Sequence, residues 1–297
     1  MGSRAPEPSD RPVTPSSVPG AQPRSRSAGE RPVKFRNPPV IETLLSVQFV
    51  PLPRLDLPYF GLFWSDIRSS YPHQEVKPPL APVVEEFPLV PKAPTVGIQV
   101  SSEPDARFWF INESGTELIQ IQRDRFIRNW RWADTGKHYP GYDELRPRFE
   151  HDWRMFVRFL DREHLGAPDV NQCEVTYVNH IELGMGWRSF GDPSPILSLV
   201  APRPGRSTFL PDPEMLLVNA TYAMPDQGGR VHVAAQPALR RSDGKEVLQV
   251  TLTARGRPRS SDLQDLVTWF NDGHEWIVNG FVDITTPTMQ DEVWHRL

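Results

Sequence analysis

The sequence has a single cysteine, Cys173, among its 297 residues. One cysteine excludes both a disulfide framework within the chain and a zinc site built from cysteine pairs. Long apolar runs are lacking as well: none approaches the roughly 20 residues that a membrane-spanning helix needs. The N-terminus also has no apolar secretory segment. We therefore expect a cytoplasmic protein that makes no contact with a membrane.

Catalytic signatures are also missing. The sequence has no glycine-rich phosphate loop, no nucleophile elbow and no Cys/His ligand pattern. His274-Glu275 is a fragment of the zinc-protease helix motif, but Val278 stands where that motif needs its second histidine. We predict no catalytic residue, no metal and no cofactor, and we interpret His274 as a hydrogen-bonded histidine of the core. The sequence does not decide whether the protein is an enzyme, although it favours a non-enzyme.

The stretch from Gln122 to Trp132 holds the densest chemical pattern, with arginines set among aromatic residues. The formal net charge of −4 excludes a protein that coats nucleic acid with its whole surface, so such contact needs a local patch like this one. Read as one strand, the stretch alternates between two faces. One face carries Gln122, Asp124, Phe126, Arg128, Trp130 and Trp132, and the other carries Arg123, Arg125, Ile127, Asn129 and Arg131.

Two interpretations of these arginines stay open. As a binding surface, the guanidinium groups hold phosphates or carboxylates while a tryptophan offers a stacking face. As structural groups, they pair with Asp124, Glu174 or acids of a covering helix. An unpaired buried arginine would cost several kcal/mol, so each buried one needs a partner in either case.

The chain divides into a tail and two modules. Residues 1–33 are rich in Pro, Ser, Arg and Gly with almost no large apolar side chains, which predicts a disordered tail. The first module spans 34–166. Its expected elements are a strand over 40–49, a helix over 58–71, a proline-rich connection or interrupted edge strand over 72–94, strands over 95–100, 107–112 and 117–132, and a long helix from Tyr142 to Leu160.

The second module, over 167–297, repeats this order. Its expected elements are a strand over 170–183, an irregular segment over 184–212, strands over 215–223, 231–237 and 246–254, and a helix from Ser260 or Ser261 through Phe281. We therefore predict an α+β fold of two antiparallel meander-plus-long-helix modules in tandem. The shared order is consistent with a duplication.

Several short segments resemble a sporadically distributed bacterial family of uncharacterised proteins, over nearly the whole ordered length. They are Asn37-Pro38-Pro39-Val40, Gln122 to Phe126 with Asn129-Trp130-Arg131, Tyr139-Pro140, Phe149, Trp153, Glu174 to Ile181, and His274-Glu275. The resemblance implies no established activity. The patchy distribution of the family points to mobile or defence-linked gene neighbourhoods, and the proline-rich tail is an addition to its usual pattern.

We expect binding residues on two strands, namely Arg123, Arg125, Arg128, Trp130, Arg131, Tyr177, Asn179 and His180. The predicted function is that of a non-catalytic binding protein in a bacterial accessory system, such as a defence-linked one. It would engage a protein or small ligand on an exposed sheet face. Two alternatives remain. One is nucleic-acid binding through the stretch from Gln122 to Trp132, which we call the Arg/Trp strand. The other is an unfamiliar hydrolase or transferase that uses Glu174, His180 and Glu182.

Overall fold

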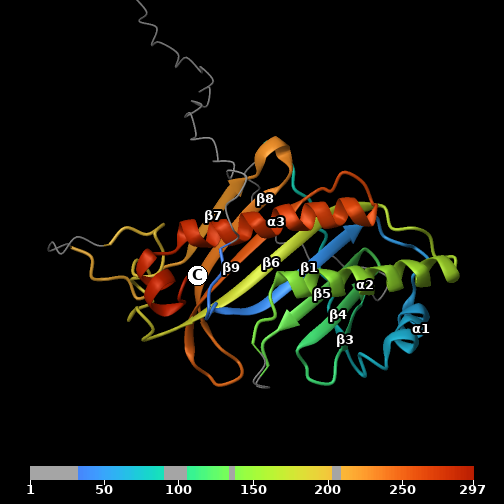
Figure 1. Ribbon diagram of the computed structural model, residues 1–297, viewed down its shortest axis with the longest axis horizontal. Coiled ribbons are helices and arrows are strands. Elements are labelled where there is room, and N and C mark those ends of the chain that lie inside the picture. The colour runs from blue at the N-terminus through green and yellow to red at the C-terminus, as the bar shows by residue number, and fades with distance from the viewer. Residues whose placement is uncertain (1–32, 90–105, 134–137, 203–208) are drawn as a thin grey trace, which may run out of the picture. The chain divides into compact units, whose positions relative to one another are not determined.

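The computed structural model describes residues 33–89, 106–133, 138–202 and 209–297. The expected tail, except its last residue, and the strand expected over 95–100 lie outside these residues. Every described strand belongs to one antiparallel sheet of nine strands, in the order β2-β3-β4-β5-β1-β6-β9-β8-β7 (Figure 1). The α+β class and the large antiparallel sheet are thus confirmed.

The two expected modules each contribute one side of this sheet. The first module contains β1 (Val40–Phe49), β2 (His73–Lys77), β3 (Arg107–Ile111), β4 (Glu117–Gln122) and β5 (Arg125–Arg131). The second contains β6 (Val170–Glu182), β7 (Val218–Ala223), β8 (Arg230–Leu239) and β9 (Glu246–Gly256). The first module has a four-stranded meander, β2 to β5, whose last strand pairs with β1, and the second has a three-stranded meander, β7 to β9, whose last strand pairs with β6. β1 pairs with β6 in the middle.

Two long helices lie side by side on one face of the sheet (Figure 1). They are α2 (Tyr142–Arg162) and α3 (Leu263–Ile284), and each follows the meander of its module. The shorter α1 (Leu57–Ile67), a 3-10 turn at Pro225–Gln227 and a π-helical turn at Met289–Val293 complete the described helices. The apolar stripes predicted both long helices correctly, although α3 begins at Leu263, after the expected serines.

Aromatic side chains join the sheet to α2 and α3. The ring of Phe126 on β5 lies 6.0 Å from that of Phe149, 5.5 Å from Trp153 and 5.2 Å from Phe156, all on α2. Phe149 in turn contacts Phe270 of α3, with ring centroids 4.8 Å apart. Large aromatic side chains in edge-to-face contact dominate the energy of such a core, so this face of the sheet is committed to packing.

The Arg/Trp stretch is two strands and not one, which corrects the predicted strand over 117–132. Arg123 and Asp124 form the turn between β4 and β5, and Gln122 pairs directly with Arg125. A two-residue turn reverses the chain, so Gln122 shares a face with Arg125 instead of with Phe126. From position 125 to 131 the predicted alternation holds, with Phe126 toward the helices.

The opposite side of the sheet, which we call the polar face, carries mainly polar side chains. Cross-strand register aligns Gln122, Arg125, Gln48 and Gln172 on neighbouring strands, and one step along aligns Ser46, Glu174, Arg255 and Arg230. These eight residues, which we call the cross-strand row, run across β4, β5, β1, β6, β9 and β8. Since period-2 alternation puts aligned residues on one face, the row is continuous across both modules.

Candidate binding site on the polar face of the sheet

An extended segment of the chain lies over the cross-strand row. We call residues 78–89 the strap. Leu80 makes two hydrogen bonds with the amide of Gln122: its N–H donates to Oε1 at 3.0 Å, and its carbonyl accepts from Nε2 at 2.9 Å. The N–H of Val83 donates to Gln48 Oε1 at 2.9 Å. The carbonyl of Ala81 accepts a hydrogen bond from Arg125 at 3.1 Å. Sheet side chains therefore bind the strap through its backbone.

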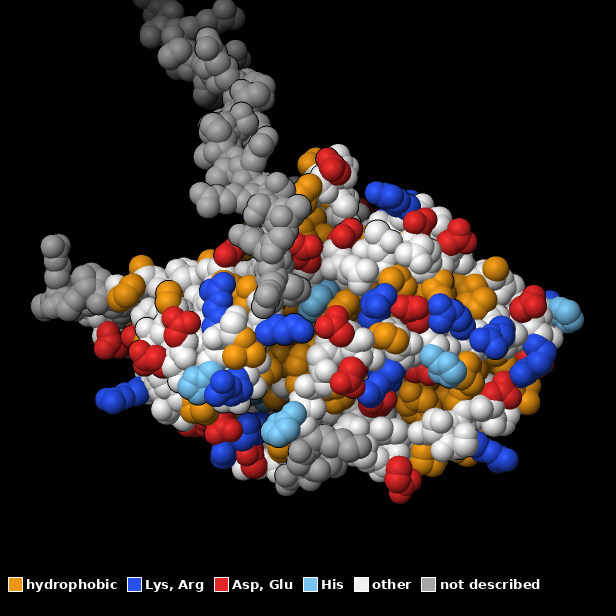
Figure 2. Space-filling view, in the orientation of Figure 1, with side chains coloured by type: hydrophobic (Ala, Val, Ile, Leu, Met, Phe, Trp, Pro, Cys, Tyr) orange, Lys and Arg blue, Asp and Glu red, His pale blue; other side chains and the backbone are white. Residues whose placement is uncertain are grey.

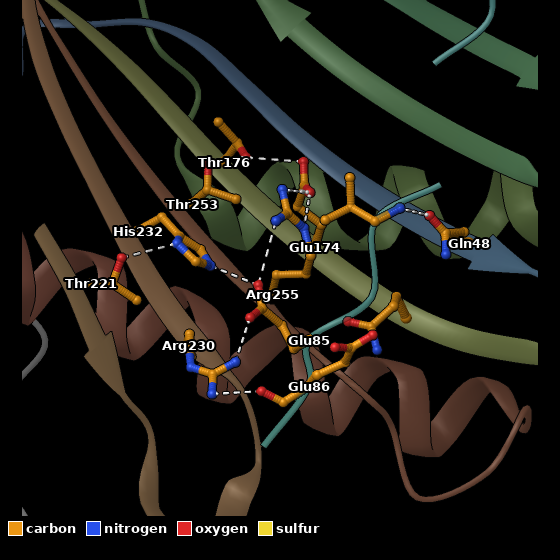
Figure 3. Close-up of polar contacts among 12 residues, drawn as sticks. Gln48, Glu85, Glu86, Glu174, Thr176, Thr221, Arg230, His232, Thr253 and Arg255 are labelled. Atoms are coloured by element: carbon orange, nitrogen blue, oxygen red, sulfur yellow. Dashed lines mark hydrogen bonds and ion pairs between the residues drawn. The ribbon is translucent and has the colours of Figure 1, made fainter. Parts of the chain in front are cut away.

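One strap side chain, that of Glu85, contacts three side chains of the sheet (Figure 3). Its carboxylate accepts from Arg230 Nη1 at 2.8 Å and contacts His232 Nε2 at 2.6 Å and Arg255 Nη1 at 3.4 Å. These three residues come from β8 and β9, and we call them the acid-binding cluster. The Glu85 and Arg230 side chains are 8% and 4% exposed, so the pair is largely removed from water.

Neighbouring groups hold the acid-binding cluster in place. Arg230 uses its second nitrogen for the carbonyl of Glu86 at 2.7 Å, and its guanidinium lies 3.9 Å above the ring centre of Phe87. Arg255 also donates to Glu174 at 2.7 Å and therefore stands between two carboxylates. Such charge-assisted bonds are about twice as strong as neutral ones.

The protonation of Glu85 follows from this setting. Burial alone raises the pKa of its carboxyl group, but hydrogen bonds from His232 and Arg230, with the charge of Arg255, outweigh burial and lower the pKa to about 2. Glu85 is consequently ionised over the physiological pH range. The cluster is a site for a carboxylate, and the chain itself supplies the carboxylate here.

Arg125, near the centre of the row, is a buried cation with only neutral hydrogen-bond partners. The side chain of Gln48 and the carbonyl of Ala81 accept from it, and among the described residues it has no ion pair. The residue is 7% exposed, and burial lowers the pKa of its guanidinium. Its Nε and the Oε1 of Gln172 are buried, and neither has a hydrogen-bond partner in the part of the chain that the structure describes.

A small cavity separates the strap from the sheet next to Arg125. Its volume is ≈ 10 Å³, which is room for about one water. The lining residues come from β5, β1, β6, β9 and the strap: Ser46, Gln48, Val83, Arg125, Gln172, Glu174 and Arg255. The cavity therefore spans the junction of the two modules, with an arginine on each side.

Of the predicted binding residues, Arg125, Arg131 and His180 lie on the polar face. Arg131 donates to the carbonyl of Gly115 at 2.8 Å and lies 5.9 Å from the ring centre of Trp109. Lys77 and Arg107 also lie against that ring, at 4.8 and 5.5 Å. Trp109 is therefore surrounded by cations of the chain itself.

The other predicted binding residues have structural roles. Arg128, 3% exposed in its side chain, faces α2, donates from Nε to Asp152 at 2.8 Å and pairs with Glu117. Arg123 pairs with Asp56 beside the β4–β5 turn. The arrangement agrees with the structural interpretation for these two arginines.

Three further predicted residues also face the helices. Trp130 is buried with its ring 5.2 Å from Tyr139, and Asn179 is buried and donates to the carbonyl of Val250 at 3.0 Å. Tyr177 contacts Nδ1 of His274 at 2.9 Å, which agrees with the prediction of a hydrogen-bonded core histidine. None of the three is accessible to a partner on the polar face.

The residues of the hydrolase alternative do not converge. Glu174 is bound by Arg255, His180 contacts Gln249 at 3.2 Å, and Glu182 pairs with Arg240 and Lys245. His180 lies six residues beyond Glu174 on one strand, which separates them by about 20 Å. Among the described residues no group of three His, Cys, Asp or Glu side chains is arranged to hold a metal ion.

The helix-covered face differs from the polar face. Figure 2 shows acidic and basic side chains interspersed over its described surface, so this surface presents no broad field of one sign to steer a charged partner. Within the described residues, no helix is long and apolar enough to cross a bilayer.

The acid-binding cluster was missed in the sequence because its members are distant from one another. Glu85 contacts Arg230 across 145 positions. Glu85 lies in the proline-rich segment interpreted as a connection or an interrupted edge strand. His232 lies on a predicted strand, whereas Arg230 and Arg255 each lie one residue outside the predicted bounds 231–237 and 246–254, on strands that the structure extends. The one available signal in the sequence was that Arg230 and His232 stand two positions apart, which places both side chains on the same face of β8.

Comparison with known proteins does not extend this description: no family model, no curated protein and no solved structure matches the chain.

Proposed function

We propose that the protein is a non-catalytic binding protein that engages a protein or small ligand on the polar face of its sheet, as part of a bacterial accessory system such as a defence-linked one. The observation that carries this proposal is the cross-strand row. Side chains from five strands of the sheet, β4, β5, β1, β9 and β8, converge on one extended segment, and they bind its backbone and its one buried carboxylate.

The chemistry of these contacts is that of a recognition surface. The Gln122 amide pairs with both backbone groups of Leu80, which is how a peptide is held independently of its side chains. The acid-binding cluster adds selection for one charge. A sheet face that served only for stability would be expected to bury apolar side chains instead, since a buried ion pair is weak evidence for stability.

Arg125 supports a ligand at the same place. The carboxylates of Asp124 and Glu174 attract its guanidinium, but its hydrogen bonds among the described residues go to neutral groups. A buried guanidinium that no carboxylate binds directly is costly. Arg125 and Arg255 border the cavity together with the amide oxygen of Gln172, which has no hydrogen-bond partner among the described residues. An added polar group would stabilise this environment.

The two alternatives have less support from the geometry. For nucleic acid, the Arg/Trp strand has Arg128 paired and Trp130 buried against Tyr139, so few of its residues are available for phosphates or base stacking. For a hydrolase, Glu174, His180 and Glu182 have separate partners, as described above. We therefore favour binding over catalysis.

A capture experiment with matched variants tests the proposed function. The tagged full chain is recovered from lysate of its source cells, and co-purifying proteins and small molecules are identified by mass spectrometry. Arg255→Met changes the polar face, whereas Arg154→Met removes a guanidinium that pairs with Glu150 on the helix-covered face. We expect the first to reduce capture at least tenfold and the second to leave capture unchanged.

Thermal melting of both variants shows whether each is folded, and Gln122→Ala provides an uncharged second change on the polar face. If capture survives both polar-face changes, or if nothing is captured by the wild type, the proposed function fails.

We also propose that the two modules derive from a duplication. Their common order of first strand, meander and long helix supports this, as does the central pairing of β1 with β6. A superposition of residues 40–162 on 170–284 in which the strands do not match in order would refute it.

A further inference from the structure

The acid-binding cluster of Arg230, His232 and Arg255 specifies the chemical class of the ligand. We propose that this cluster receives an acidic side chain of an extended partner peptide, and that Glu85 of the strap is an internal ligand which the peptide displaces. This inference rests on the binding function proposed above and adds the nature of the partner.

The cluster is built as a carboxylate site. Arg230 and His232 approach different oxygens of Glu85, at 2.8 and 2.6 Å, and Arg255 approaches from the neighbouring strand at 3.4 Å (Figure 3). His232 is oriented by Thr221, whose Oγ1 lies 3.3 Å from Nδ1. These positions are set by paired strands of the sheet, so the donors stay in place whichever carboxylate they bind.

The remainder of the strap is held in a way that another peptide can reproduce. Gln122, Gln48 and Arg125 contact backbone atoms of Leu80, Val83 and Ala81, and every residue type except proline offers the same N–H and C=O groups. The side chains from Ala81 to Val84 are exposed. The sheet therefore selects an extended backbone and one acidic side chain, and reads little else between positions 80 and 84.

Loss of Glu85 from the cluster requires a replacement anion. Arg230 is nearly fully buried, and a buried guanidinium without its carboxylate is strongly unfavourable. Simple opening of the strap is thus disfavoured, whereas exchange of one carboxylate for another keeps the cluster neutralised. The site behaves as a competitive one, in which the tethered strap lowers the apparent affinity for the free peptide.

A further contact refines the ligand. The guanidinium of Arg230 lies over the ring of Phe87, two positions after Glu85, and a cation over an aromatic face adds a modest attraction. The preferred peptide therefore carries an aromatic residue two positions after its acid. The cluster favours a carboxylate over a phosphate. Arg255 is shared with Glu174, so the greater negative charge of a phosphate would be repelled by the nearby Glu174 carboxylate.

Competition binding with the full chain tests the inference. The probe is a fluorescent synthetic peptide with the sequence of residues 78–89, and fluorescence anisotropy reports its binding. We expect the Glu85→Gln protein to bind this probe at least tenfold more tightly than the wild type, because its own strap has lost the charge. The matched control is Glu214→Gln, which removes the same charge from an exposed side chain outside the strap and should bind as the wild type does.

Changes to the probe separate the possible outcomes. A second probe, with glutamine at the position of Glu85, should bind at least tenfold more weakly than the first. A single-stranded oligonucleotide should not compete. If the two probes bind equally, if the oligonucleotide displaces the peptide, or if no probe binds either protein, the inference is overturned.

A second measurement on the wild type avoids dependence on a variant's folding. Excess probe should increase amide hydrogen exchange of residues 80–87, since the displaced strap loses its hydrogen bonds, and unchanged exchange at saturating probe refutes displacement. If these peptide tests fail but capture from lysate still depends on Arg255, the acidic-peptide inference is refuted and the proposed function stands. Failure of both would remove both.

Discussion

His274 allows a quantitative prediction, because it ends a hydrogen-bonded chain in the core. The hydroxyl of Tyr139 donates to that of Tyr177 at 2.9 Å, so the proton of Tyr177 is directed to Nδ1 of His274, also at 2.9 Å. The imidazole stacks on Tyr142 at 3.9 Å between ring centres. This arrangement needs a neutral imidazole that accepts at Nδ1, and burial lowers the pKa of His274 to about 4.

The sign and size of the effect follow from linkage. The unfolded chain takes up a proton near pH 6.5, whereas the folded protein does so near pH 4, so stability is complete above the first value and is lost as pH falls between them. From pH 8 to pH 5 the loss attributable to His274 is about 2 kcal/mol, at 1.36 kcal/mol per pKa unit. Below pH 4 it levels off at about 3 kcal/mol.

Urea unfolding of the wild type and of His274→Gln at pH 8 and pH 5 measures this difference. Glutamine can accept the hydrogen bond from Tyr177 but does not titrate, and the other titrating groups are common to both proteins. The free energy of unfolding of the wild type should therefore fall by about 2 kcal/mol more than that of the variant. Equal losses, or a His274 pKa above 6 by NMR titration, would refute the reasoning.

Further changes test the packing and the strap. Asp152→Ala should lower the free energy of unfolding by about 3 to 5 kcal/mol in urea, because it leaves Arg128 buried with one acid fewer. Glu85→Gln should remove an acid-dependent loss: between pH 4.5 and about pH 2 the wild type should lose on the order of 1 to 2 kcal/mol more than the variant, since its carboxyl pKa lies at about 2. A parallel loss in both proteins would contradict this. Gly256→Ala should lower the melting temperature by several degrees, because an added Cβ would lie 2.1 Å from the carbonyl oxygen of Gly228; an unchanged melting temperature would show that this backbone can move.

Local sequence patterns predicted the long helices well, but they did not predict the hairpin between β4 and β5. The stripes of α2 and α3 are long enough that tertiary contacts could not override them, and both helices are confirmed. The alternation through Arg123 and Asp124 looked continuous because a two-residue turn with no glycine leaves little trace in the pattern. The prediction therefore assigned side chains from position 125 onward to the correct faces of the sheet. It placed a continuous strand where the structure has the turn at Arg123 and Asp124.

The site was harder to predict than the fold because its determinants are long-range and are made by side chains with backbone atoms. Pro78, Pro79 and Pro82 made the strap look like a simple linker. Its hydrogen bonds to Gln122 and Gln48 join positions 42 and 35 residues apart, and hydrophobic periodicity carries no information on such contacts. Nothing in the local sequence of Glu85 distinguishes it from its neighbour Glu86.

Arg125 and Arg128 show where sequence reasoning ends and tertiary structure decides. They are three residues apart on one strand, so alternation places them on opposite faces, and this much was predictable. The partners of each arginine then depend on which part of the chain covers its face of the sheet. Helix α2 brings Asp152 to Arg128 and makes it a structural residue, whereas the strap brings Arg125 only a backbone carbonyl. A stable core would not be expected to leave a buried cation without a directly bound carboxylate, and this difference is why we propose the polar face, and not the arginine-rich strand as a whole, as the surface that receives a ligand.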